Sequence, residues 1–389
     1  MSEKTVSSAV ITGVRAEPAS RWDVLVIGAG PAGTLTAALA ARQGLRVLLV
    51  EKRQFPRDKV CGGCVNGAAL GVLERAGLLD RLSEAGGVWI DRFDLMALGR
   101  RLSVPLNGGL AISRSRFDQI LVAGAVDSGA VFLDQTLASV LPDDPSEGGP
   151  LRRVALRGPR ADEIMVEAKV VVAADGLENR CLSRLPEFRP RVDPRSHVGL
   201  AARTGIESAT HAPRPGTIGM AVGLAGYVGL VLDETQTVHL AAAVSPERLR
   251  ASGGPADCVT QILRESHLPF DVDLEPLAWQ GTGPITQQAS RFSGRRLFVV
   301  GDAAGYIEPF TGEGIAWALA GAEQLAPLAV AGAACWSDTL ASQWAARLRR
   351  MQRQRRWLCR FLTSGLRKPA MVSLAVTGLA RAPALAKWL

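Results

Sequence analysis

The sequence predicts an α/β fold in which a domain of alternating strands and helices is interleaved with a strand-rich domain. Apolar strands, glycine-rich turns and helices follow one another over 23–51 and again over 297–320. Between them, 227–232 and 237–243 alternate in the manner of neighbouring strands. Strands separated by helices form parallel sheets. We therefore expect a parallel sheet built from both ends of the chain and a strand-rich part from its middle.

The first glycine-rich turn has the spacing of a dinucleotide-binding fingerprint. Gly28-Ala29-Gly30-Pro31-Ala32-Gly33 follows the strand 23–27 and opens a helix over 34–43, and the next strand, 47–50, ends at Glu51. The glycines allow a tight turn and close approach of a pyrophosphate, and an acid about 20 residues on can accept a hydrogen bond from a ribose. We predict a Rossmann-type domain whose cofactor-binding residues here are Gly28, Gly30, Ala32, Gly33, Glu51 and Lys52.

A second turn of this kind lies far along the chain. The strand 297–300 runs into Gly301-Asp302 and then, through Thr311-Gly312-Glu313-Gly314, into an alanine-rich helix. A strand that ends in Gly-Asp can place a carboxylate beside a sugar-like hydroxyl, and a glycine-rich turn at a helix start offers free N–H groups to an anion. Two such elements predict a large phosphorylated cofactor that is bound at two separated places.

The combination resembles FAD-dependent oxidoreductases related to p-hydroxybenzoate hydroxylase and, within them, the geranylgeranyl reductase family. The resemblance covers about 23–325 and is strongest at the N-terminal fingerprint, Lys59-Val60-Cys61-Gly62-Gly63, Ala174-Asp175-Gly176, and Gly301-Asp302 through Gly314. It implies FAD as the cofactor, with Asp302 on the ribityl chain. It also implies that Gly312, Gly314 and Ile315 lie near the flavin ring and that Pro309 lies beside it.

Two middle motifs complete the expected FAD site. By resemblance, Arg114 lies near the FAD phosphates or ribityl chain, with Arg116 as a competitor and a solvated charge as the alternative. Asp175 belongs to an Asp-Gly turn that serves both FAD and NAD(P)H in related hydroxylases, which implies NADPH or NADH as the reductant. The Ser and Arg that usually follow that turn are replaced by Asn179 and Leu182.

The Lys59-to-Cys64 stretch has several interpretations. Geranylgeranyl reductases carry a similar Cys-Gly-Gly turn beside the flavin, so Cys61 is a candidate catalytic residue, together with Pro309. A glycine-rich structural turn with small buried thiols is the main alternative. A redox pair with Cys64 and a metal site are weaker ones, since no second cysteine pair or close histidine pair completes four zinc ligands. We therefore expect no metal.

Domain boundaries follow from the motifs. We expect a discontinuous FAD-binding domain at 21–84, 112–189 and 287–335, a substrate domain at 85–111 and 190–286, a basic amphipathic helical segment at 336–389, and a flexible tail at 1–20. The resemblance implies that the substrate domain roofs the flavin with an antiparallel sheet.

The net charge of +8 has a local origin, because nine cations lie between 347 and 368. A basic amphipathic helix can lie on an anionic membrane surface, or it can cap the core with a solvated basic face. No recognition motif accompanies the charge, so we expect no nucleic acid partner. Sparse cysteines, no apparent secretory signal and no uninterrupted apolar run of ~18 residues predict a cytoplasmic protein, with peripheral membrane contact as a further expectation.

Three function classes follow. The first is NAD(P)H-driven reduction of a C=C bond in a lipophilic small molecule, as in geranylgeranyl reductases, and it is preferred. The second is flavin-dependent hydroxylation of an aromatic or polyketide substrate. Halogenation is disfavoured because the Trp-x-Trp-x-Ile-Pro segment of halogenases is absent and Gly226-Tyr227-Val228-Gly229 stands in the comparable place. The third class is a non-catalytic FAD-binding partner protein.

Overall fold

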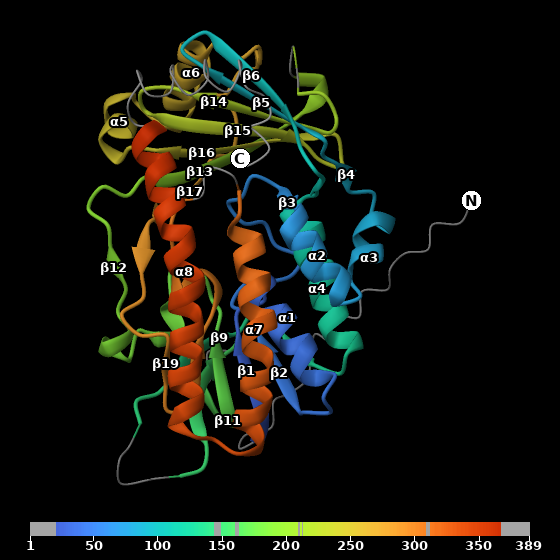
Figure 1. Ribbon diagram of the computed structural model, residues 1–389, viewed down its shortest axis with the longest axis vertical. Coiled ribbons are helices and arrows are strands. Elements are labelled where there is room, and N and C mark those ends of the chain that lie inside the picture. Colours follow the sequence, from blue (N-terminus) through green and yellow to red (C-terminus); the bar gives the residue numbers. More distant parts are fainter. Residues whose placement is uncertain are drawn as a thin grey trace.

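The computed structural model describes residues 21–143, 149–159, 163–208, 211, 213–308 and 312–366, with side chains as far as Arg353. Figure 1 shows two stacked parts: a sheet with its helices α1, α4 and α7, and a second sheet that lies across their upper ends. The predicted tail at 1–20 and the segment 367–389 fall outside the described residues.

The first sheet has eight strands and a parallel centre. Its main path is β19-β20-β11-β1-β2-β8, and β10 and β9 extend from β11. The pairs β1–β11, β1–β2, β2–β8 and β11–β20 are parallel. The strands are β1 (Arg21–Ile27), β2 (Val47–Val50), β8 (Val131–Leu133), β9 (Leu137–Val140), β10 (Arg152–Arg157), β11 (Glu163–Ala173), β19 (Ser293–Gly294) and β20 (Leu297–Val299).

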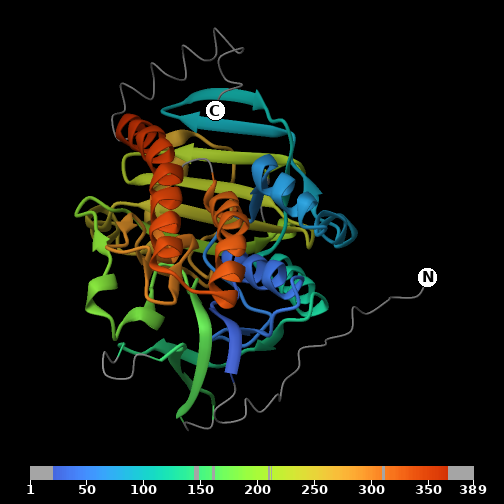
Figure 2. The ribbon, with the colours of Figure 1, turned by 60° about the horizontal axis from the view of Figure 1, so that its bottom comes forward.

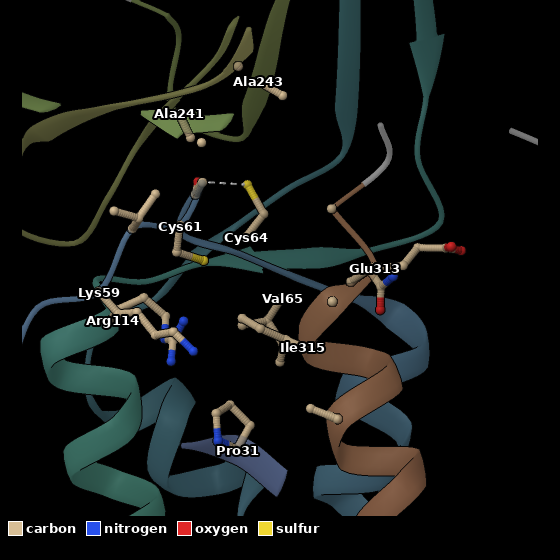
Figure 3. Close-up of a pocket in the computed structure, with 18 of the residues that line it drawn as sticks. Pro31, Lys59, Cys61, Cys64, Val65, Arg114, Ala241, Ala243, Glu313 and Ile315 are labelled. Carbon is tan, nitrogen blue, oxygen red and sulfur yellow. Dashed lines mark hydrogen bonds between the residues drawn. The ribbon is translucent and has the colours of Figure 1, made fainter. Parts of the chain in front are cut away.

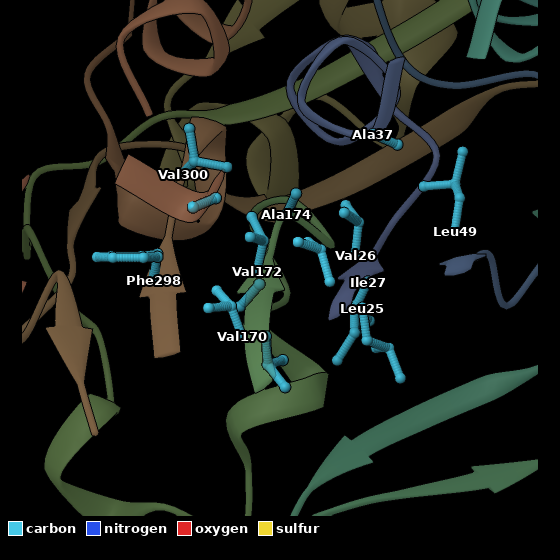
Figure 4. Packing of buried hydrophobic residues seen from close by; sticks show 14 of the residues in the cluster. Leu25, Val26, Ile27, Ala37, Leu49, Val170, Val172, Ala174, Phe298 and Val300 are labelled. Carbon is cyan, nitrogen blue, oxygen red and sulfur yellow. The ribbon is translucent and has the colours of Figure 1, made fainter. Parts of the chain in front are cut away.

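The core of this part consists of the continuous apolar runs that parallel strands require, since helices cover both of their faces. Leu25, Val170, Val172 and Phe298 are fully buried in one cluster, and Figure 4 shows them side by side on β1, β11 and β20. The covering helices are α1 (Pro31–Ala41), α4 (Arg114–Asp127) and α7 (Gly314–Ala334). The predicted helix 34–43 begins three residues earlier, because proline is favoured in the first turn.

The helix α7 is a core helix. Within the described residues it alone has the length and composition of a membrane span, and 56% of its most apolar stretch is buried inside the protein. Trp344 of the next helix, α8 (Asp338–Leu366), is fully buried and donates a hydrogen bond from Nε1 to the carbonyl of Val299 on β20 at 3.0 Å. The described start of α8 therefore caps the core, which is one of the two arrangements expected for the basic amphipathic segment.

The second sheet has seven strands in the order β17-β13-β16-β15-β14-β5-β6. It combines β5 (Arg92–Ala97) and β6 (Arg100–Pro105) with β13 (Val198–Gly205), β14 (Thr217–Val222), β15 (Gly226–Leu232), β16 (Thr237–Val244) and β17 (Gln280–Pro284). Its neighbours are antiparallel except β14 and β5, which run parallel. The antiparallel sheet that the resemblance implied therefore contains one parallel pair, because β5 comes from a separate chain segment and no hairpin joins it to β14.

Successive residues of each strand point to opposite sides, so this sheet has two different faces. Leu230, Leu240 and Val228 point to a cluster with the helix α6 (Pro255–Ser266), next to α5 (Pro246–Ala251). Met220, Tyr227 and Ala243 point the other way, toward the first part of the molecule. Figure 2 shows this sheet in yellow-green as a layer over the helices.

Smaller elements connect the two parts. The strands β3 (Cys64–Asn66), β7 (Gly109–Ala111) and β4 (Val88–Trp89) form one three-stranded sheet, beside α2 (Gly67–Arg75) and α3 (Leu79–Glu84). Another sheet contains β12 (Arg191–Val192), β18 (Gln287–Gln288) and β21 (Gly305–Tyr306), and short 3-10 turns lie at Arg180–Leu182, Pro186–Phe188, Ile206–Ser208 and Gly301–Ala304. The predicted α/β fold with a helical C-terminal region is confirmed by this architecture and by the solved structures compared below.

Candidate functional site

One cavity of about 1190 Å³ is lined by the turns that follow strands of the eight-stranded sheet and by strands of the seven-stranded sheet. Figure 3 looks into it: Pro31 at the start of α1 lies below, Ala241 and Ala243 of β16 lie above, and Cys61 lies between them. Most of the sequence-predicted site residues line this cavity, namely Gly28, Gly30, Glu51, Lys52, Cys61, Arg114, Asp175, Asp302, Gly312, Gly314 and Ile315. Pro309 lies outside the described residues.

The turn before α1 leaves room where an anion would bind. A Cβ on Gly30 would meet only the Arg57 guanidinium, at 3.9 Å, whereas a Cβ on Gly33 would lie 1.9 Å from the carbonyl oxygen of Gly28. Gly33 and Ala32 therefore pack inside the fold and are not among the residues that line the cavity. No side chain caps α1, so its first N–H groups and the positive end of its dipole face the space above Gly30.

Behind that turn lies a compact group of charges, and the sequence reading missed two of its members. Asp118 is fully buried and accepts hydrogen bonds from Arg114 at 2.8 and 3.1 Å and from Arg57 at 2.9 Å. Arg57 also lies 3.4 Å from Glu51, whose Oε2 accepts a hydrogen bond from Ala29 N at 3.0 Å. Arg57 lies in the loop after β2, within Phe55-Pro56-Arg57.

Arg114 is a structural cation as well as a cavity-lining one. Burial alone would lower the pKa of its guanidinium, but the Asp118 carboxylate and the Cys61 thiol beside it outweigh burial and raise that pKa. Arg114 is therefore permanently charged. Arg116 lies on the same first turn of α4 but is directed to Gln119, 3.4 Å away, and does not line the cavity. The helix α4 begins at Arg114, because the Ser113 hydroxyl caps it.

The second glycine-rich turn meets the cavity from the other side. Lys59 Nζ lies 3.6 Å from Asp302 Oδ2, and both side chains line the cavity. Gly312 has a φ of +70° with nothing within 4 Å of the Cβ it lacks, and α7 begins after it without a side-chain cap. Two uncapped helix starts, those of α1 and α7, therefore face one cavity.

Asp175 is held by its own turn. Its carboxylate accepts hydrogen bonds from the Cys181 amide at 2.9 Å and from the Cys181 thiol at 3.2 Å. Burial raises the pKa of Asp175, and these two hydrogen bonds oppose the rise. Both carboxylate oxygens of Asp175 are thus hydrogen-bonded to Cys181. The Ser and Arg that usually follow this Asp-Gly turn are absent from this chain.

Cys61 and Cys64 face different surroundings although both line the cavity. Cys61 lies beside Arg114. The Cys64 thiol donates a hydrogen bond to the Gly62 carbonyl at 3.3 Å, drawn in Figure 3. Burial raises the pKa of Cys64 to about 12, and the neighbouring Cys61 adds to the rise, so Cys64 is a neutral thiol. Within the described residues, no group of three His, Cys, Asp or Glu side chains could hold a metal ion.

The other wall of the cavity carries no charge in the described residues. The charged lining side chains come from 51–59, 114, 175–178 and 302–313, and the seven-stranded sheet contributes apolar or neutral ones only. The larger apolar members of this wall are Phe93, Leu95, Leu102, Val104, Ile218, Met220, Tyr227, Val231 and Ile285. Sequence reasoning could not select them, because they come from strands far apart in the chain.

The residues at the charged wall fit a flavin dinucleotide. The open backbone at Gly30 and the uncapped start of α1 suit a pyrophosphate, Glu51 suits a ribose, and the open turn at Gly312 suits the edge of a flavin ring. Asp302 and Lys59 lie where a polyhydroxyl linker would connect these two ends.

Comparison with protein families and curated proteins agrees with this fit. The FAD binding domain family matches residues 21–331. Conditioned medium factor receptor 1 of Dictyostelium discoideum is 26% identical across 80% of this chain, and the chain spans only 63% of that protein. Menaquinone reductase of Mycolicibacterium smegmatis is 28% identical across 80% of the chain and 77% of the relative. Digeranylgeranylglycerophospholipid reductase of Methanosarcina acetivorans is 27% identical across 76% of the chain and 71% of the relative.

Solved structures share the fold. The myxobacterial chondrochloren halogenase CndH has a TM-score of 0.74 at 20% identity, covering 89% of this chain and 82% of its own. The p-nitrophenol 4-monooxygenase PnpA from Pseudomonas putida DLL-E4 has a TM-score of 0.72 at 18% identity, covering 92% and 93%. At these identities the likeness extends to the fold alone.

Proposed function

Because the chain belongs to the FAD binding domain family, within the superfamily of FAD-dependent oxidoreductases and monooxygenases, we propose that it reduces a carbon–carbon double bond of an uncharged, lipophilic small molecule. The observation that carries this proposal is the separation of charge in the cavity. Every charged side chain that lines the described cavity lies on the side that fits the cofactor, and the sheet opposite offers apolar and neutral groups.

This separation of charge selects the substrate by the free energy of moving its groups from water to the apolar wall. Moving an unpaired carboxylate or phosphate from water to an apolar wall is strongly unfavourable, whereas apolar surface gains about 25 cal/mol per Å² that is removed from water. A charged substrate group would find no charged partner among the residues of β5, β6 or β13–β17 that line the cavity. A hydrophobic group would contact side chains such as Leu95, Met220 and Ile285.

The chain's own residues bind, orient and exclude water. Bound FAD would supply the redox chemistry itself. Arg114, fixed by Asp118, and Lys59, beside Asp302, would hold the cofactor's polar groups on one side of the cavity. Cys61 lies on the turn between these groups and Ala241, where its side chain would touch the reacting part of the substrate. We propose NADPH or NADH as the reductant on the strength of the Asp175-Gly176 resemblance.

The relatives' names support reduction as the reaction. Two of them are reductases, of menaquinone and of digeranylgeranylglycerophospholipid. Menaquinone is an uncharged quinone, whereas the phospholipid carries a phosphate, so the first name supports an uncharged substrate and both support reduction. Hydroxylation is the second candidate, favoured by the fold shared with a p-nitrophenol monooxygenase.

Product analysis tests the proposal. The FAD-loaded protein is incubated with NADPH or NADH and menaquinone, once without oxygen and once with it, and any quinol is reoxidised to the quinone before mass spectrometry. A product of the anaerobic sample that still carries two additional hydrogen atoms, located at a former carbon–carbon double bond by fragmentation, supports reduction. A product that gains one oxygen atom, in the aerobic sample only, overturns reduction in favour of hydroxylation, and the loss of both products in Cys61→Ala and Arg114→Ala variants ties the chemistry to this cavity.

A further inference from the structure

We propose that the turn between β15 and β16 positions the Cys61 side of the cavity, with His239 and Glu234 as positioning residues; this rests on the proposed function, which places Cys61 beside the substrate. His239 and Glu234 lie five residues apart on one hairpin of the seven-stranded sheet. Each contacts a different segment of the FAD-binding part, one at the Cys61 turn and one at the start of α4.

His239 supports the Cys61 turn from behind. Gly63 has a φ of +68°, and the Cβ it lacks would lie 3.5 Å from His239 Cγ and 3.6 Å from its Nδ1. The imidazole therefore packs directly on the Gly63 backbone. Next to this contact, the Cβ that Gly62 lacks would lie 3.7 Å from Ala241, two residues after His239 on β16. Because His239 and Ala241 point to the same face of β16, this strand packs against both Gly62 and Gly63.

The imidazole is itself held in place. Its Nε2 lies 2.6 Å from Asp233 Oδ2, and both side chains are buried. The other oxygen of Asp233 accepts hydrogen bonds from Thr235 N, Thr235 Oγ1 and Thr237 N, at 2.8, 2.7 and 3.1 Å. Burial alone would raise the pKa of Asp233, but the hydrogen bonds from His239 and Thr235 outweigh it and lower the pKa. An ionised, fully bonded carboxylate thus fixes the ring orientation.

Glu234, the next residue, holds the start of α4. Its two carboxylate oxygens accept hydrogen bonds from Ser113 N at 2.9 Å and from Ser113 Oγ at 2.6 Å. Ser113 caps α4, and Arg114 follows it as the first residue of that helix. Glu234 therefore sets the position from which Arg114 reaches Asp118 and the cavity.

Arg203, on the seven-stranded sheet, makes a third contact between this sheet and the segment that contains Cys61. Arg203 pairs with His239 across β13 and β16, and its guanidinium binds both oxygens of Asp58 at 3.0 and 2.6 Å. Asp58 lies three residues before Cys61. The sheet thus contacts the turn on both sides of Cys61 and holds Arg114 next to it, so the catalytic thiol and the cation would keep a fixed relation to a substrate that lies against the sheet.

The test uses the FAD-loaded, full-length protein and the alkylation of Cys61 by N-ethylmaleimide, followed by mass spectrometry of its peptide. Cys335, which is exposed, reports reagent activity, and Cys258, which is buried in the sheet's own core, reports global loosening. In His239→Ala and Glu234→Ala the turn loses its support, so we expect the Cys61 rate to rise about five-fold or more relative to Cys335, with Cys258 unlabelled. His239→Gln, which can still donate to Asp233, should return the rate to within about two-fold of the wild type.

Matched controls separate positioning from general destabilisation. Glu247→Ala removes a similar contact, Ser245 Oγ to a carboxylate at 2.6 Å at the start of α5, away from the cavity, and should leave Cys61 unchanged. Unchanged Cys61 labelling in both alanine variants overturns the proposal. Labelling of Cys258 that rises together with the labelling of Cys61 in every Glu234 and His239 variant, including Glu234→Gln, also overturns the proposal. Failure of the wild-type protein to reduce any lipid substrate, with the labelling pattern intact, contradicts the proposed function and leaves the positioning contact established.

Discussion

The Nζ of Lys59 lies 3.6 Å from Oδ2 of Asp302, which brings the loop after β2 against the turn after β20. The two residues are far apart in the chain, and both side chains line the cavity. A cation and a carboxylate that are only partly exposed, at the meeting point of two glycine-rich turns, form a polar site for the middle of a long cofactor.

Asp302→Asn tests this polar site. The amide keeps the shape of the side chain but loses the charge that strengthens a hydrogen bond from a ribityl hydroxyl. A hydrogen bond to a charged group is worth about 1.5–3 kcal/mol, so the Kd for FAD should rise about ten-fold or more. Titration of the apoprotein with FAD, followed by flavin fluorescence, measures it. Asp127→Asn, on an exposed pair with Arg81, is the control, and equal FAD affinity in both variants would refute the role of Asp302.

Gly33→Ala tests the packing of α1 on β1. The added Cβ would lie 1.9 Å from the Gly28 carbonyl oxygen, which is backbone and cannot turn aside. Overpacking of this kind costs typically about 1–3 kcal/mol, and the shift of Gly28 should also release FAD. Thermal unfolding and flavin content of the purified protein measure both effects. Gly158→Ala, where no atom lies within 4 Å of the new Cβ, should match the wild type, and a Gly33→Ala protein that also matched it would show the packing to be wrong.

The Cys64 thiol should have an unusual pH profile. Because its pKa is raised to about 12 and only the thiolate reacts, its alkylation rate should still rise about ten-fold per pH unit between pH 8 and pH 10. An unstructured cysteine peptide should level off once the pH passes about 8.5. Peptide mapping after timed iodoacetamide treatment follows Cys64 separately from Cys61. A Cys64 profile that levels off with the peptide would contradict the burial that raises this pKa.

Vesicle flotation tests the expected membrane contact of α8. Arg350 and Arg353 are exposed on the side of α8 opposite to the buried Trp344 and Leu348. Each surface cation is worth about 1 kcal/mol at an anionic membrane, so the double serine variant should bind phosphatidylserine vesicles about 30-fold more weakly at low salt. Serine at Arg248 and Arg250 of α5 is the charge-matched control. Absence of wild-type flotation at low salt would remove the membrane proposal.

The cofactor side of the site was predictable because its signals are local. Gly28, Gly30 and Gly33 are spaced by the geometry of one turn, and Gly301-Asp302 follows directly on one strand, so each motif can be recognised within a few residues. Their meeting in one cavity follows from the parallel order β20-β11-β1-β2, because parallel strands end at the same edge of a sheet.

The remainder depends on contacts that no short stretch encodes. Asp118 looks like an ordinary helix residue until Arg57 and Arg114 meet it from two segments. His239 belongs to none of the sequence motifs, and only the pairing of β13, β15 and β16 brings it against Gly63. The apolar wall requires strands from 92–105 and 198–284 to join one sheet, and the sequence predicted that sheet without its parallel pair.

The uncharged wall is tested most directly by the binding of a matched pair of ligands. A neutral polyprenyl alcohol and the carboxylic acid of the same chain length are titrated into the FAD-loaded protein at pH 8, and flavin absorbance is followed. The wild type should bind the alcohol about ten-fold or more tightly than the acid, a difference of about 1.4 kcal/mol. Gln280→Lys, which places a cation on this wall at the exposed strand β17, should reduce or reverse that preference. Equal or tighter binding of the acid by the wild type would contradict the proposal of an uncharged, lipophilic substrate.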